Sequence, residues 1–235
     1  MKPKTKGKSI AILQSNYIPW KGYFDIINMV DEFVFHDDLQ YTKNDWRNRN
    51  LIKTEKGPTW LTIPCGMNEK RLICEVQLPD RKWQKKHWLK IEKYYRKSKY
   101  WLLYKDFFAD IYLKNKWNSL SELNQALIRS ISHDILSIKT VFRDSREFNL
   151  VESRAERVME LIKKTNATIY LSGPSAKNYL KEKDFSSAGI TLQWMDYSNY
   201  FEYPQLFPPF NHKVSIIDLI FNVGDRAKEY MKSFQ

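Results

Sequence analysis

The architecture follows from one stretch near the N-terminus, Ser9-Ile-Ala-Ile-Leu-Gln-Ser-Asn-Tyr-Ile-Pro-Trp-Lys-Gly-Tyr-Phe-Asp-Ile-Ile-Asn-Met-Val-Asp-Glu-Phe-Val-Phe-His36. Two short apolar runs, Ser9 to Leu13 and Glu32 to His36, have the length and composition of buried strands. Between them a polar loop, Gln14 to Trp20, leads into a helical pattern from Gly22 to Val30. This order of elements favours parallel pairing of the two strands, with the helix in the crossover.

The alternation of strands and helices returns in the second half of the chain. Its strand patterns are Ser137 to Phe142, Thr168 to Ser172 and Ile190 to Met195. The middle of the chain is helical instead. We therefore expect a single α/β domain over residues 1–235, with a mostly parallel, Rossmann-like sheet and a helical insertion at about residues 80–135.

Shorter patterns complete this expectation. Thr59 to Pro64 and Leu72 to Leu78 predict a further pair of strands, arranged as a hairpin. Asp80 suits the N-cap of a helix from Lys82 to Lys97, and Ser119-Leu-Ser-Glu122 matches a capping box at the start of another.

The composition limits the classes of protein. Lysine and arginine outnumber aspartate and glutamate by 39 to 27, and a formal net charge of +12 favours anionic partners. No run of about 18 apolar residues appears, so no membrane span is expected. The basic N-terminus precedes a strand-like run and not a signal-peptide core, which indicates a cytoplasmic protein. Cys65, Cys74 and four scattered histidines match no metal motif, so we expect reduced thiols and no metal site.

The loop between the first strand and the first helix is the first candidate site. Ligands of open α/β sheets bind at this position, and a helix N-terminus offers free N–H groups to an anion. The loop is neither a glycine-rich dinucleotide fingerprint nor a P-loop. Its candidate residues combine polar groups with aromatic rings: Gln14, Asn16, Tyr17, Trp20 and Tyr23.

The second candidate, His36-Asp-Asp-Leu-Gln-Tyr41, follows the second strand. Asp37 and Asp38 face opposite ways on a strand, so we expect them to do different work. His36 suits a general base near neutral pH, and the alternative is a histidine packed against the core. Gln40 adds an amide for substrate binding.

The third candidate is Lys43-Asn-Asp-Trp-Arg-Asn-Arg-Asn50. Arg47 and Arg49 suit bidentate phosphate contacts, and Asn48 and Asn50 add directional hydrogen bonds. The alternative is a solvated charged loop.

Two segments near the C-terminus resemble binding loops. In the first, Gly173 permits close backbone approach, Ser175 can cap a helix and Lys177 can meet a phosphate. In the second, Gln205 precedes a proline-rich loop that ends at His212 and suits a cover over a substrate.

One predicted helix is strongly basic. Lys82, Lys86, Lys90, Lys93 and Lys97 share a face by helical spacing. Trp88, Ile91 and Tyr95 fall on the opposite face, which predicts that they pack in the core. The lysine face is either a solvated surface or a docking surface for an acidic partner or for RNA.

Several of these blocks together resemble the WbqC-like family. The opening string from Ala11 to Phe24 and the continuation from Asp37 to Asn50 match its first two blocks. Tyr170 to Tyr179, Tyr203-Pro-Gln205 and Ser215 to Asp218 resemble its C-terminal blocks, so the resemblance runs nearly from end to end. Members of this family are linked to gene clusters for O-antigens and other surface glycans, including glycans with glycyl-amino or acyl-amino sugars.

The resemblance implies an N-acyltransferase, or a glycyl or other aminoacyl transferase. The enzyme would form an amide on the amino group of a nucleotide-linked amino sugar in surface-glycan biosynthesis. The attacking amine must be neutral, so His36, Asp37 or Asp38 would act as the base. Gln14, Asn16 and Tyr17 would orient the sugar or stabilise the oxyanion, and Arg47, Arg49 and Lys177 would hold phosphates.

The sequence leaves the acyl donor and the function class open. The donor would be a thioester on an acidic carrier protein, a coenzyme thioester, or an adenylate made from ATP. The alternative functions are an ATP-dependent, adenylate-forming amide ligase and a nucleic-acid-binding module that uses the basic helix. The absence of a recognised nucleic-acid-binding motif argues against the last.

Overall fold

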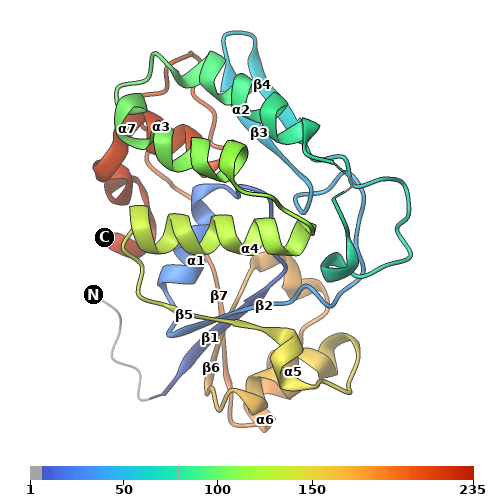
Figure 1. Ribbon diagram of the computed structural model, residues 1–235. Coiled ribbons are helices and arrows are strands. Elements are labelled where there is room, and N and C mark those ends of the chain that lie inside the picture. The colour runs from blue at the N-terminus through green and yellow to red at the C-terminus, as the bar shows by residue number, and fades with distance from the viewer. Residues whose placement is uncertain (1–6, 79) are drawn as a thin grey trace.

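The computed structural model describes residues 7–78 and 80–235. Within them, five parallel strands form one sheet in the order β5-β2-β1-β6-β7 (Figure 1). The strands are β1 (Ser9–Leu13), β2 (Glu32–Phe35), β5 (Val141–Asp144), β6 (Ile169–Ser172) and β7 (Thr191–Trp194). This confirms the predicted α/β class with a parallel, Rossmann-like sheet.

Helices cover both faces of this sheet. Figure 1 shows α1 (Lys21–Asn28) and α4 (Leu120–Ser130) on one side of it, and α5 (Arg154–Lys164) and α6 (Glu182–Ser187) on the other. Alternate strand residues supply the two apolar layers because neighbouring side chains on a strand point to opposite faces. In β1, Ala11 packs in the cluster that contains α1 and α4, whereas Ile10 and Ile12 pack in the cluster that contains α5 and α6.

A second unit of structure lies above the first face. The antiparallel hairpin of β3 (Arg49–Thr54) and β4 (Gly57–Thr62) packs with α2 (Lys82–Tyr95), α3 (Trp101–Ala109) and α7 (Ile216–Val223). The predicted core face of α2 is confirmed, since Trp88, Ile91 and Tyr95 are buried. None of the described helices is long and apolar enough to cross a lipid bilayer.

The predicted hairpin had the wrong partner strand. The strand that pairs with residues 57–62 is Arg49–Thr54, and residues 72–78 form a single 3₁₀ turn, Ile73–Glu75, flanked by isolated bridges. The sequence did not indicate β3 because a lysine occupies one of its buried positions. The Lys53 side chain is buried, and its ammonium donates a hydrogen bond to the Pro209 carbonyl. A charged residue at a buried position interrupts the apolar pattern by which a strand is recognised.

The helix starts were predicted more accurately. Helix α2 begins at Lys82 as predicted, but its N-cap is Arg81, and the Asp80 carboxylate one residue earlier accepts a hydrogen bond from the Lys82 amide at 2.8 Å. Ser119 is the N-cap of α4, and its hydroxyl accepts a hydrogen bond from the Glu122 amide at 3.2 Å. Helices α2, α3 and α4 lie between β4 and β5 in the chain. We interpret them as the helical insertion expected at about residues 80–135.

A buried carboxylate on α7 connects α2 with the segment that contains Tyr203 and Gln205. Asp218 on α7 accepts hydrogen bonds from Tyr95 Oη at 2.9 Å, Tyr203 Oη at 2.8 Å and Gln205 Nε2 at 2.9 Å. Burial raises the pKa of this carboxyl group. The Tyr95 hydroxyl also accepts from the Lys53 amide at 3.0 Å, so one side chain connects α2, β3 and α7.

Replacing Tyr95 with phenylalanine should lower the free energy of unfolding by about 1–3 kcal/mol, because a buried acceptor and a buried amide each lose a partner. Tyr94→Phe is the matched control, since its half-buried ring lies on the preceding residue of the same helix. That control should stay within about 0.5 kcal/mol. Urea unfolding measures both variants, and equal effects would contradict the importance of the Asp218 network.

Candidate functional site

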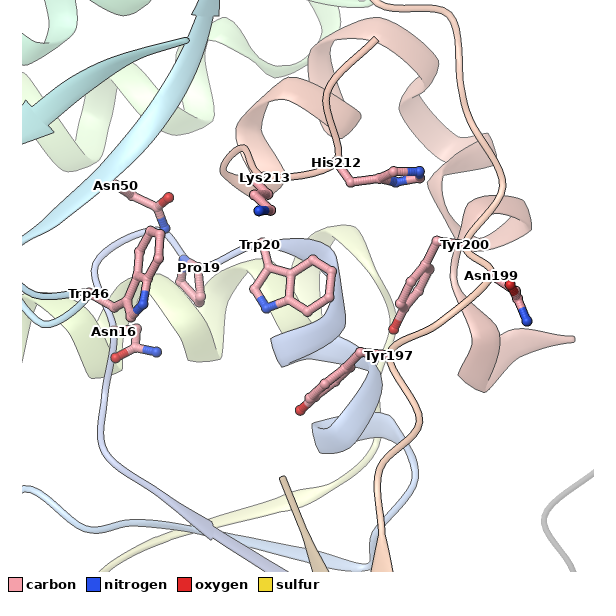
Figure 2. A pocket seen from close by; sticks show the side chains of 10 residues that line it. All are labelled: Asn16, Pro19, Trp20, Trp46, Asn50, Tyr197, Asn199, Tyr200, His212 and Lys213. Atoms are coloured by element: carbon pink, nitrogen blue, oxygen red, sulfur yellow. The ribbon is translucent and has the colours of Figure 1, made fainter. Parts of the chain in front are cut away.

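A cavity of about 580 Å³ opens at the carboxyl ends of the central strands (Figure 2). It is formed by the loop after β1, the segment that leads into β3, the segment after β7 and the loop before α7. The residues that line it are Asn16, Pro19, Trp20, Trp46, Asn50, Tyr197, Asn199, Tyr200, His212 and Lys213. Its place agrees with the usual ligand crevice of parallel α/β sheets.

Asp37 fixes the beginning of the loop after β1. This fully buried carboxylate accepts a hydrogen bond from the Ser15 amide at 2.8 Å, and Ser121 and Gln125 of α4 donate to its other oxygen. The Tyr23 hydroxyl donates to the Gln14 carbonyl at 2.9 Å from the other side. These hydrogen bonds therefore hold Gln14 and Ser15, the first two residues of the loop, in place.

Asn50 fixes the end of the same loop. Its side-chain amide donates to the Tyr17 and Ile18 carbonyls at 3.0 and 2.9 Å. Ile18 has φ of 36°, in the left-handed region that a β-branched residue rarely adopts. Such backbone strain, about 1–3 kcal/mol, persists only where the surroundings enforce it, as Asn50 does here.

Aromatic rings form one wall of the cavity. The ring centroid of Trp20 lies 5.2 Å from that of Tyr197 and 5.5 Å from that of Tyr200. The Tyr200 hydroxyl donates to buried Asp25 of α1 at 2.6 Å, and Lys21 donates to the Phe201 carbonyl at 3.0 Å. These contacts tie the segment after β7 to the start of α1.

His212 and Lys213, from the loop before α7, also line the cavity. The His212 ring packs edge-on against Phe210 with centroids 4.5 Å apart, and its Nδ1 has no hydrogen-bond partner among the described residues. Burial, and then the charge of Lys21, lower the pKa of His212 below its ordinary value of 6.5. In Figure 2 the Lys213 side chain extends from this loop toward Trp20.

The structure brings three predicted binding residues together beside this cavity. The Arg47 guanidinium donates to the side chains of Gln14 and of Asn16, the latter at 3.4 Å. Asp45 lies 3.3 Å from the same guanidinium and partly offsets its charge. The loop after β1 and the segment before β3 thus present polar groups to one place.

Arg49 lies next to this group. Its guanidinium stacks 4.2 Å from the ring centroid of Trp60, and Trp60 contacts Trp46 with centroids 5.7 Å apart. Trp46 and Trp60 are both partly exposed. A row of aromatic and cationic groups therefore continues from the cavity wall onto β4.

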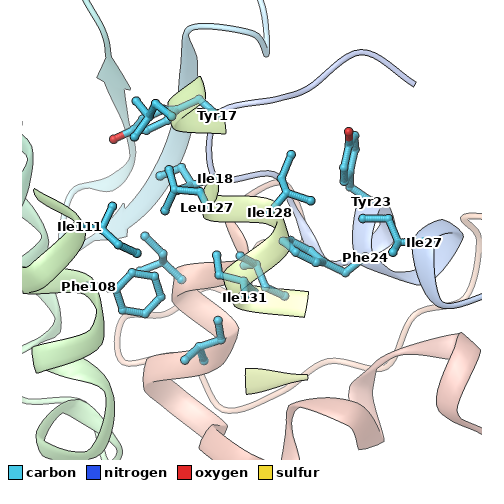
Figure 3. Packing of buried hydrophobic residues seen from close by; sticks show 14 of the residues in the cluster. Tyr17, Ile18, Tyr23, Phe24, Ile27, Phe108, Ile111, Leu127, Ile128 and Ile131 are labelled. Atoms are coloured by element: carbon cyan, nitrogen blue, oxygen red, sulfur yellow. The ribbon is translucent and has the colours of Figure 1, made fainter. Parts of the chain in front are cut away.

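Tyr17 and Tyr23, predicted from the same loop, point elsewhere. Tyr17 is buried, and its hydroxyl is hydrogen bonded to His87 Nδ1 at 2.8 Å and to the Tyr112 hydroxyl at 2.6 Å. Figure 3 shows Tyr17 and Tyr23 among the packed apolar residues near α4. Burial raises the pKa of both phenols well above 10.0, so both stay protonated.

The residues after β2 are also placed away from the cavity wall. Asp37 faces α4 and Asp38 faces α5, which agrees with the expected alternation. Asp38 accepts hydrogen bonds from Arg157 and Ser145, and Arg157 Nε donates to His36 Nε2 at 3.3 Å. Burial lowers the pKa of His36 to about 4, which leaves a neutral, packed imidazole at pH 7.

The remaining predicted binding residues separate into two groups. Asn48 and Gln205 bind backbone groups of other segments: the Asn48 side chain donates to the Ile63 carbonyl, and the Gln205 side chain donates to the Asn211 carbonyl. Gln40 is exposed and bridges to Leu72.

The segment after β6 forms the other group. A side chain added at Gly173 would meet open space, Ser175 is exposed, and the Lys177 ammonium lies 5.5 Å from the Trp194 ring. None of the three is among the residues that line the cavity.

Neither the cysteine thiols nor the potential metal ligands among the described residues indicate a further site. Cys65 and Cys74 are free, and burial raises the pKa of both, to about 11 for Cys65. A protonated thiol is a poor nucleophile. Among residues 7–78 and 80–235, no three His, Cys, Asp or Glu side chains cluster as metal ligands would.

Sequence reasoning missed His212, Lys213, Tyr197 and Tyr200 as individual site residues. The proline-rich loop that ends at His212 was a usable signal, because it was interpreted as a substrate cover. The segment that contains Tyr197 and Tyr200 also had a sequence signal, because it follows the carboxyl end of a parallel strand, where ligands usually bind.

Comparison with known proteins agrees with the resemblance found in the sequence. The WbqC-like protein family matches residues 14–230. A protein of Mycobacterium tuberculosis (strain ATCC 25618 / H37Rv), named as uncharacterized, is 42% identical over 227 residues, which cover 96% of this chain and 98% of the relative. No solved structure matches the chain significantly. The family match includes every segment that lines the cavity, and the chain belongs to the WbqC-like protein family.

Proposed function

We propose that the chain is an N-acyltransferase that forms an amide on the amino group of a nucleotide-linked amino sugar in surface-glycan biosynthesis. The acyl group includes glycyl and other aminoacyl groups. Membership of the WbqC-like family supports the glycan setting, and the cavity at the strand ends supports the substrate class.

One observation carries this proposal, namely the mixture of groups around a single cavity. Trp20, Trp46, Tyr197 and Tyr200 supply ring faces, and Asn16 and Asn199 supply amides. Ring faces stack on sugars and bases, while amides bind hydroxyl groups in fixed directions. Arg47 beside the cavity supplies a cation for a diphosphate, and Lys213 in the wall adds a second positive charge.

The nucleotide is proposed to lie between the loop after β1 and the segment before β3. There the Arg47 guanidinium is already oriented by Gln14 and Asn16, so little side-chain entropy is lost on binding. The amino sugar then extends past Trp20 toward His212.

Amide formation requires a neutral amine, and His212 is proposed as its base. The depressed pKa of His212 keeps the imidazole neutral at pH 7, so it can accept a proton as the amine nitrogen attacks the acyl carbon. The C–N bond forms, the bond from carbon to the donor breaks, and the departing group takes up a proton. Lys213, which follows His212 in the chain, is the group proposed to face the developing oxyanion.

This assignment moves the base away from the residues after β2. His36, Asp37 and Asp38 are bound to Arg157, Ser145 and α4, and none lines the cavity. In the proposal they hold the strand ends in place.

Replacing Arg47 with alanine should weaken the binding of a nucleotide-linked amino sugar by about 1–3 kcal/mol, the range for a hydrogen bond to a charged group. Calorimetric titration measures this change directly. Lys177→Ala is the comparator, because Lys177 lies outside the cavity wall and should bind as the wild type does. A loss of affinity in Lys177→Ala with none in Arg47→Ala would place the phosphates at the end of β6 instead.

His212→Gln should lower kcat by roughly 10²–10⁴-fold while the KM for the sugar nucleotide changes little. The neutral imidazole is the active form and its pKa lies below 6.5, so wild-type kcat should hold down to about pH 6.5 and then fall. The variant should lack this acid limb. His36→Gln should instead lower the melting temperature, and an unchanged kcat in His212→Gln together with loss of turnover in folded His36→Gln would return the base to His36.

A further inference from the structure

The outer face of α2 and of the turn that follows it is strongly basic. The sixteen residues from Lys82 to Lys97 contain six lysines, one arginine and a single glutamate, and so supply half of the formal net charge of +12. The exposed members are Lys82, Lys85, Lys86, Lys93, Arg96 and Lys97. Lys90 is only partly exposed because its ammonium donates to the Trp60 carbonyl at 3.1 Å, so it forms the edge of the face. We call this surface the α2 basic face.

Exposed leucines interrupt these charges. Leu89 is 51% exposed, and its place three residues after Lys86 and four before Lys93 puts it among the lysines. Helix α3 packs on α2 through stacked Trp88 and Trp101, and its first turn exposes Leu102 by 77% and Leu103 by 63%. Leu89 adds apolar area among the lysines, and a protein partner can cover apolar area that a phosphate cannot.

Contacts connect the α2 basic face to the cavity. Lys90 binds the Trp60 carbonyl, the Trp60 ring contacts Trp46, and Trp46 lines the cavity. A flexible chain anchored on α2 therefore has a path over exposed aromatic rings to the place where the amine is proposed to react.

We infer that the α2 basic face docks an acidic carrier protein that bears the acyl group as a thioester on a flexible prosthetic arm. This rests on the proposed function and names its donor. The amine nitrogen bonds to the thioester carbon, the C–S bond breaks, and the thiolate leaves on the carrier and is protonated. Acidic side chains of the carrier pair with the lysines, and its apolar side chains cover Leu89. The face is about 20 Å long at helical rise, enough for one partner helix.

The variant Lys86→Glu/Lys93→Glu tests the docking. Its matched control is Lys181→Glu/Lys183→Glu, which makes the same change in charge on exposed lysines at the start of α6, across the sheet from α2. The probe is a purified, dye-labelled acyl carrier protein of the acidic type, titrated with full-length chain and followed by fluorescence anisotropy at low and high salt. Leu89→Ser tests the apolar contact separately.

We expect the α2 charge reversal to weaken carrier binding at least tenfold, Leu89→Ser to weaken it severalfold, and the control to stay within about twofold of the wild type. Equal losses in the reversal and its control would mean that only net charge matters, and would overturn the inference. No binding by the wild type, or binding of a transfer RNA that the α2 reversal alone abolishes, would overturn it as well.

Turnover separates this inference from the proposed function. With acylated carrier as donor, the α2 reversal should raise KM about tenfold, whereas with a carrier-free acyl-pantetheine thioester it should leave KM unchanged. An equal rise for both donors would contradict docking on α2. Carrier binding that depends on the α2 basic face, without any transfer to an amino sugar, would support the docking surface and refute the proposed reaction.

Discussion

The geometry of the site depends on one buried carboxylate. Asp37 emerges from β2 and accepts hydrogen bonds from the amide of Ser15 after β1 and from two side chains of α4. Gln125, one of these two, also donates to Asp144 at the end of β5 at 2.7 Å. Three neighbouring strand ends are therefore joined through charge-assisted hydrogen bonds, which are strong where water is excluded.

The cavity lies beside these hydrogen-bonded strand ends and is lined by segments that are far apart in the chain. The loop after β1 is held at its start by Asp37 and at its end by Asn50, and its Trp20 meets Tyr197 and Tyr200 from the segment after β7. Asp218 then holds the loop that carries His212 through Tyr203 and Gln205. A rigid scaffold thus presents polar and aromatic groups from loops, as binding sites on parallel sheets commonly do.

Local patterns were enough to predict the sheet and the region of the site. The first strand, the first helix and the second strand could be predicted because their apolar residues recur with the period of a strand or of a helix. In a parallel sheet, the loops that follow the two strands then lie at the carboxyl ends. The helix starts at Lys82 and Leu120 could be predicted because contacts of the first turn are local, although the N-cap of α2 is Arg81 and not Asp80.

Long-range packing decided what local patterns could not. The Tyr17 hydroxyl looked like a site group in sequence, but its partners His87 and Tyr112 lie 70 and 95 residues away. His36 looked like a base, and only its contact with Arg157 on α5 shows that it is packed. Conversely, His212 gained its place in the cavity wall from the folding of the loop before α7 onto Asp218.

We propose that the cavity between Trp20 and Trp46 holds a nucleotide-linked amino sugar. A crystal structure of the chain soaked with a nucleotide-linked 4-amino sugar would locate the ligand. We expect density in this cavity, with the diphosphate beside Arg47 and the amino group within hydrogen-bond reach of His212. Density against Lys177 after β6, with the cavity left empty, would refute the proposal.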